Sequence, residues 1–142
     1  MAETMKLTVD TGAITIELVD EKGRDIGTFD FNPADSNIIR RYKEVVERFG
    51  GIAQRIRDAG GLGEEEVCKV SDEIAEQIDY LLGYNVSEQV FCRLGALTIT
   101  GNGDLYFERV LDGIADVIEK VTNKRVEKKL ERVRKATEKY SK

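Results

Sequence analysis

The chain has 142 residues and no histidine, which limits the chemistry that its side chains could perform. Histidine is the usual general acid or base near neutral pH, so an enzyme built from this sequence would depend on carboxylates, Lys, Tyr or Cys. The two cysteines, Cys68 and Cys92, do not form a C-x-x-C pair, and no histidine could complete a zinc site with them. We therefore expect no catalytic site, no bound metal and no cofactor.

Two glycine-rich stretches could cradle a phosphate. The first, residues 60–63, lacks a following Lys-Ser or Lys-Thr and is followed by three glutamates at 64–66, which would repel a phosphate. The second, residues 101–103, resembles part of a dinucleotide fingerprint, but Tyr106 stands in place of the third glycine and Asp104 carries the wrong charge. We interpret both stretches as loops.

Carboxylates recur at helical spacing in two rows, which are Asp72, Glu73, Glu76 and Asp79, and Asp112, Asp116 and Glu119. Such rows could hold magnesium or calcium, but solvated helix faces show the same pattern and the ligand order of a calcium loop is missing. We interpret them as acidic faces. A metal-dependent enzyme stays as an alternative.

Hydrophobic periodicity predicts an α+β fold. Alternating apolar and polar residues indicate about three short antiparallel strands between residues 5 and 31, with Leu7 and Val9 in the first of them. Such strands need a helical layer to cover their apolar face. Asn32 as cap and Pro33 in the first turn mark the start of a helix, whose apolar stripe continues to Ile56.

The helical part has several features that the periodicity alone leaves open. Gly50-Gly51 could kink or divide the first helix. A second helix with an apolar stripe from Val67 to Leu81 should end near Gly83, and a last helix should begin with a stripe from Phe107 to Val121. Between them, Ser87 should cap a short helix in which Cys92 packs as a small hydrophobe. Residues 97–107 fit either a strand with a turn or a loop. In the last helix, a five-residue offset at Asn123 indicates a bend or a rotated second helix.

Charge divides the chain into two parts. Residues 122–142 carry a net charge of +6, whereas residues 1–121 carry −11, for a total of −5. We therefore expect an α+β body at 1–121, with strands at 5–31 and helices from 33 onward, and a basic amphipathic helix at 122–142. No apolar run could cross a membrane, and the N-terminal residues lack the pattern of a secretory signal, so we expect a cytoplasmic protein.

The basic helix could bind nucleic acid, associate with protein, or simply be solvated. Glutamates interrupt its basic run and the acidic body would repel phosphates, so we favour protein association and expect no binding to nucleic acid or membrane. The apolar stripe and nearby cations of this helix supply the candidate interface residues, which are Val126, Lys128, Lys129, Leu130, Arg132, Val133 and Tyr140.

The order of these features resembles a known family. Extended segments lead into F-x-F-N-P-x-D at 29–35, a helical body follows, and a segment at 104–114 precedes a charged C-terminal helix. In this the chain is similar to the small tail assembly chaperones of siphophages and prophages of Gram-positive bacteria. The resemblance implies a non-enzymatic, self-associating protein that coats the phage tape measure protein before the tail tube polymerises around it. The tail tube protein is a further candidate partner, and a completion or connector protein retained in the virion is the alternative.

Overall fold

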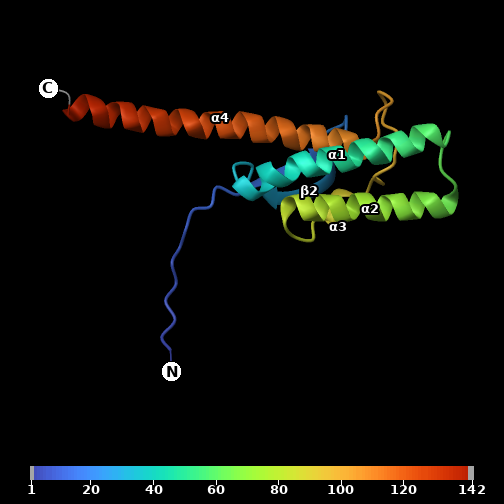
Figure 1. The fold of residues 1–142 in the computed structure, drawn as a ribbon, viewed down its shortest axis with the longest axis horizontal. Helices are drawn as coiled ribbons and strands as arrows, with labels where there is room; N and C mark the ends of the chain where they lie inside the picture. Colours follow the sequence, from blue (N-terminus) through green and yellow to red (C-terminus); the bar gives the residue numbers. More distant parts are fainter. Residues whose placement is uncertain (1, 141–142) are drawn as a thin grey trace.

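The computed structural model describes residues 2–140, with the side chains of 139 and 140 left out, and it has an α+β fold (Figure 1). Strand β1 (Ile14–Val19) pairs antiparallel with β2 (Asp25–Phe31), and four helices, α1 to α4, follow. The sheet has two strands, so the prediction of about three is wrong. The α+β class and the long C-terminal helix are confirmed.

The predicted strand that the structure lacks was expected within residues 2–9, which we call the N-terminal arm. The arm is extended and leaves the body of the protein (Figure 1), so its alternating residues have no sheet to join. Met5, Leu7 and Val9 are 90%, 89% and 64% exposed. The alternation correctly indicated extended chain, but alternation alone does not supply a pairing partner.

Helix α1 (Ser36–Asp58) begins three residues after the predicted start. The Asn32 side chain instead closes a turn by accepting a hydrogen bond from the Ala34 amide (3.0 Å). Asp35 caps the helix, because its carboxylate accepts from the Asn37 amide (2.9 Å). The helix continues through Gly50 without a break, so the glycine pair does not divide it.

Helix α2 (Glu64–Leu82) returns alongside α1 (Figure 1) and ends, as predicted, at Gly83, which adopts the left-handed conformation with φ of 81°. Helix α3 (Ser87–Val90) follows. The prediction that Ser87 caps it is wrong, since Val86 is the cap and the buried Ser87 hydroxyl donates to Asp79 (3.0 Å). Cys92 is exposed rather than packed in the core.

Helix α4 (Tyr106–Tyr140) is preceded by a tight loop. Within residues 97–107 a single bridge joins Ile99 to Leu105, so of the two predicted alternatives this stretch is a loop, closed by one bridge, rather than a strand. The Tyr106 amide bonds the Thr98 carbonyl (2.8 Å), which positions the start of α4. The helix runs without a break past Asn123, so no second helix begins there, and Figure 1 shows α4 without the predicted bend.

The core lies where the sheet meets α1, α2 and the first half of α4. Phe49 of α1 and Phe107 of α4 pack edge to face with centroids 4.9 Å apart. The predicted stripes of α1, α2 and the first part of α4 supply its most buried members, which include Val45, Phe49, Ile52, Ile74, Ile78, Leu81, Phe107 and Ile114. None of the described helices is both long enough and apolar enough to cross a membrane.

Candidate functional site

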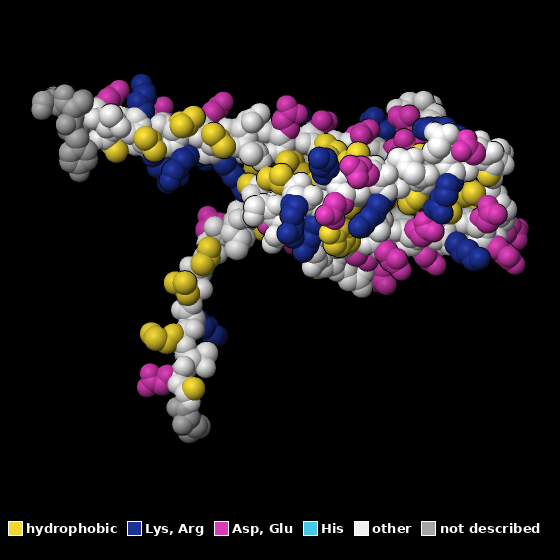
Figure 2. Space-filling model, viewed as in Figure 1, with side chains coloured by type: hydrophobic (Ala, Val, Ile, Leu, Met, Phe, Trp, Pro, Cys, Tyr) yellow, Lys and Arg dark blue, Asp and Glu magenta, His cyan; other side chains and the backbone are white. Residues whose placement is uncertain are grey.

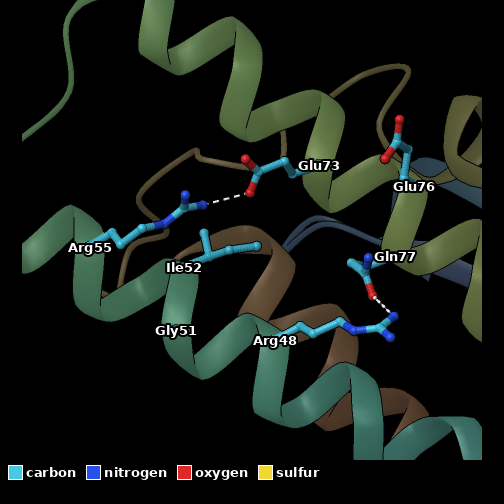
Figure 3. A pocket seen from close by; sticks show the side chains of 7 residues that line it. All are labelled: Arg48, Gly51, Ile52, Arg55, Glu73, Glu76 and Gln77. Carbon is cyan, nitrogen blue, oxygen red and sulfur yellow. Dashed lines mark hydrogen bonds and ion pairs between the residues drawn. The ribbon is translucent and has the colours of Figure 1, made fainter.

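A shallow groove between α1 and α2 is the first candidate for a binding or catalytic site (Figure 3). Its floor includes Ile52, and two polar contacts cross it. Arg55 forms an ion pair with Glu73 (2.5 Å), and Arg48 donates to the Gln77 side chain (2.8 Å). These two contacts link α1 to α2 across the groove, whose lining also includes the exposed Glu76.

Tyr80 makes a second link between the same helices. Its hydroxyl donates to Glu44 of α1 (2.5 Å), and the guanidinium carbons of Arg41 and Arg48 lie 5.3 and 5.2 Å from its ring centroid. The hydrogen bond to Glu44 is the main cause that raises the pKa of Tyr80. Its phenol is therefore a neutral donor that ties α2 to α1.

The predicted acidic face at 72–79 is divided by the structure. Glu73 is paired with Arg55, and Asp79 points back toward the α2–α3 connection, where it accepts from the amides of Val86 (2.8 Å) and Ser87 (2.7 Å). Only Asp72 and Glu76 are fully solvent-facing. Half of the predicted row thus stabilises the fold.

The second acidic row lies on α4 beside α1. Burial is the main cause that raises the pKa of Tyr42, and the negative charges of Asp112 and Asp116 raise it further. In the part of the chain that the structure describes, no three His, Cys, Asp or Glu side chains are grouped as metal ligands would be. The metal alternative therefore finds no geometric support among these residues.

Tyr106 is the most strongly perturbed titratable group. It is 5% exposed, and its hydroxyl donates to the Val90 carbonyl (3.0 Å). Burial raises the pKa of Tyr106 to about 12. This phenol is neutral at physiological pH and fastens the start of α4 to the end of α3.

Helix α4 leaves the body near Arg125. The Arg125 guanidinium donates to the Asn32 side chain (3.0 Å) and to the Gly12 carbonyl (2.6 Å). Beyond it, every side chain described from 126 to 138 is exposed, and the helix projects away from the body (Figure 1). We call residues 126–140 the projecting helix.

An apolar stripe runs along the projecting helix. Val126, Leu130 and Val133 are 50%, 61% and 50% exposed. Their spacing of four and three residues places them on one face, and Figure 2 shows hydrophobic side chains along this part of α4. Nothing in the described structure covers them. The side chain of Tyr140, the last predicted member, lies outside the described residues.

Some charged side chains of the projecting helix form ion pairs with one another and others do not. Arg134 pairs with Glu131 (2.6 Å) and Glu138 (3.7 Å) along the helix. By contrast, none of the residues the structure describes forms an ion pair with the cations predicted for this surface, which are Lys128, Lys129 and Arg132. The structure thus places the predicted interface residues on one unburied helix. Helical spacing puts Lys129 next to the apolar stripe, whereas Lys128 and Arg132 lie on another face.

Two structural residues were not predicted to matter. Arg125 looked like one cation in a basic run. It comes directly before Val126, the first residue of the apolar stripe, at the point where α4 leaves the body. Asp79 looked like a solvated carboxylate, because no local pattern shows that the chain returns after α2 and brings the amides of Val86 and Ser87 to it. Comparison of the chain with protein-family models, curated proteins and solved structures found no significant match.

Proposed function

We propose that this protein is a phage tail assembly chaperone, which self-associates and covers the apolar face of the tape measure protein before the tail tube forms. The observation that carries the proposal is the projecting helix, whose stripe at Val126, Leu130 and Val133 is at least half exposed. Exposed apolar stripes on a helix are typical of surfaces that bind another helix. The resemblance described above supplies the identity of the partner.

The size of the stripe supports many weak contacts rather than one strong contact. Burying a Val or Leu side chain fully contributes about 1.5–3 kcal/mol, and these three are already about half covered. Their remaining burial is worth roughly 2–5 kcal/mol before the entropic cost of association. One copy would therefore bind weakly, whereas many linked copies along one long helical partner would bind tightly.

Charge supports association between copies. The body carries −11 over residues 1–121 and the following segment carries +6. Exposed acids such as Asp72 and Glu76 could face Lys128, Lys129 or Arg132 of a neighbour. Because exposed charges are screened within about 10 Å at 0.1 M salt, this self-association should weaken as salt rises.

The test of self-association is light scattering of the purified protein across a concentration series. The first variant carries Leu130→Asp and Val133→Asp, which remove the stripe. Its matched control carries Lys124→Gln and Lys135→Gln, which lower the net charge by the same amount and leave the stripe intact. A third protein ends at Arg125, which keeps the contacts to Gly12 and Asn32.

At each concentration the full chain and the Lys→Gln control should form larger assemblies than the Leu130/Val133 variant and the shortened chain. Circular dichroism checks that each variant keeps its helices. Equal assembly of the Leu130/Val133 variant and its control would contradict the proposal. A ring of one fixed size at all concentrations would favour a connector retained in the particle instead.

A further inference from the structure

We propose that the N-terminal arm of one copy adds as a third strand to the open edge of β1 in a second copy. This inference concerns a surface distinct from the projecting helix and goes beyond the function proposed above. It rests on two features of the same chain, an unpaired strand-like segment and an unpaired strand edge.

The arm is an extended segment without partners. No hydrogen bond joins residues 2–9 to the rest of the described chain, and the large apolar side chains of the arm, Met5, Leu7 and Val9, are all exposed. Figure 2 shows these side chains along the arm, away from the body. Met5, Leu7 and Val9 alternate with polar residues, so in a sheet they would share one face.

The junction between arm and sheet holds the arm away from its own β1. Arg125 binds the Gly12 carbonyl, and the Asn32 side-chain amide donates to the Thr11 carbonyl. The Asp10 carboxylate accepts from the Gly12 amide (3.2 Å), and Gly12 adopts a positive φ of 84°. Because Thr11 and Gly12, which follow the arm, are fixed to the end of β2 and to α4, the arm leaves in a direction that separates it from the sheet (Figure 1).

The outer edge of β2 is closed. The Asp30 amide donates to the Tyr84 hydroxyl (3.0 Å), and that hydroxyl donates to the Asp30 carbonyl. Farther along β2, a side chain at Gly27 would meet the Gln89 carbonyl at 2.6 Å, so the connection after α2 lies directly against the strand. A further strand could not pair there.

The outer edge of β1 is open. Since Thr15 lies opposite Asp30, whose backbone groups face Tyr84, this pair does not exchange hydrogen bonds and the Thr15 backbone groups point outward. Two residues along, Glu17 has the same orientation. Among residues 2–140 no group bonds these outward amides and carbonyls. Such an edge is a template for an added strand.

The arm fits this edge in length, polarity and charge. The segment from Met5 to Val9 extends about 17 Å at roughly 3.3 Å per residue, close to the length of β1. Its apolar face would extend the core-facing row of β1, which is only half buried and consists of Ile14, Ile16 and Leu18. Its polar face would bring Lys6 to the side of Glu17.

A second copy is the occupant because each chain carries both halves of this contact. A copy that donates its arm still has an open β1 edge, so the contact can repeat along a series of copies or close into a ring. An arm that folded back onto its own β1 would have to change direction between residues 9 and 14, where Arg125 and Asn32 hold the carbonyls of Gly12 and Thr11.

Disulfide trapping between mixed chains tests the inference. All proteins carry Cys68→Ser and Cys92→Ser, which replace the two exposed native cysteines, and Leu130→Asp with Val133→Asp, so that α4 does not bring copies together. Arm variants with Lys6→Cys or Thr8→Cys are mixed in all combinations with edge variants carrying Thr15→Cys or Glu17→Cys. The control mixes each arm variant with Asp72→Cys, an exposed position on α2.

At least one arm–edge mixture should give disulfide-linked dimers in at least tenfold excess over the Asp72→Cys control. Adding Leu7→Ser to the Thr8→Cys arm should reduce that yield about tenfold. Lys6→Ser should reduce it by less than about threefold, because it removes one exposed charge pair with Glu17 and leaves the apolar row intact. Yields equal to the control in all four mixtures would overturn the proposal. A chain that carries both an arm cysteine and an edge cysteine gives a further check. If it cross-links only within itself, the arm returns to its own β1 and the proposal is overturned.

Discussion

The Arg125 guanidinium donates a 2.6 Å hydrogen bond to the Gly12 carbonyl, joining residues 113 positions apart. The same side chain also bonds Asn32, so it holds three segments at one point: the end of the arm, the end of the sheet and the place where α4 leaves the body. Two surfaces diverge from this point, the arm and the projecting helix. Their directions relative to the body therefore depend on one partly buried cation.

Replacing Arg125 with Ala should lower the free energy of unfolding by about 1.5–3 kcal/mol, the range for hydrogen bonds to charged groups. Urea denaturation followed by circular dichroism measures this change. Arg132→Ala is the matched control, because Arg132 is exposed on the projecting helix and should change stability by less than about 0.5 kcal/mol. Equal effects of the two substitutions would show that Arg125 does not anchor α4.

Asp79→Ala should destabilise the protein by about 1–3 kcal/mol, because it leaves the amides of Val86 and Ser87 without their acceptor. Glu76→Ala, one turn earlier on α2 and exposed, should change stability by less than about 0.5 kcal/mol. Thermal unfolding of the two variants beside the parent protein measures the difference. If Asp79→Ala behaves like Glu76→Ala, the carboxylate does not stabilise the α2–α3 connection.

Gly50→Ala should stabilise the protein by roughly 0.5–1 kcal/mol. Gly50 lies inside α1, and a Cβ there would meet no atom within 4 Å, so alanine lowers the entropy of the unfolded chain without a clash. Gly83→Ala should have the opposite sign, because Gly83 has a φ of 81° and a Cβ would lie 3.2 Å from Arg41. Denaturant unfolding of both variants is the measurement, and stabilisation by both would contradict this account of Gly83.

The pKa of Tyr106 is raised by burial from 10.0 to about 12, so its neutral form is favoured in the folded protein. The contribution to stability is complete below pH 10 and is lost as the pH rises toward 12, because the unfolded chain releases this proton first. Stability should therefore fall more steeply between pH 10 and 12 in the parent protein than in Tyr106→Phe. Parallel slopes in urea denaturation across that range would contradict the assignment.

The helices could be predicted because their information is local. Stripes at spacings of three and four residues correctly indicated α1, α2 and the buried start of α4, and Gly83 correctly marked the end of α2. The five-residue offset at Asn123 does not bend the helix. It instead moves the apolar stripe to another face at the point where α4 leaves the core.

Features that depend on distant partners could not be predicted in the same way. Met5, Leu7 and Val9 alternate as strand residues do, but alternation does not say whether a neighbouring strand exists. Asp79 belongs to the same helix-spaced row of carboxylates as Asp72, and only the return of the chain after α2 gives Asp79 two amides to accept from. The candidate interface residues from 126 to 133 were chosen from charge and spacing, and the structure adds that the helix bearing them stands clear of the body.

The most direct test of the chaperone proposal is co-expression with a phage tape measure protein that is insoluble alone, followed by measurement of its soluble fraction. The full chain and the Lys124→Gln, Lys135→Gln control should keep most of the tape measure protein soluble and co-purify with it in many copies. The variant with Leu130→Asp and Val133→Asp should leave it in the pellet. Equal solubility with both variants, or an insoluble tape measure protein in the presence of the full chain, would contradict the proposal.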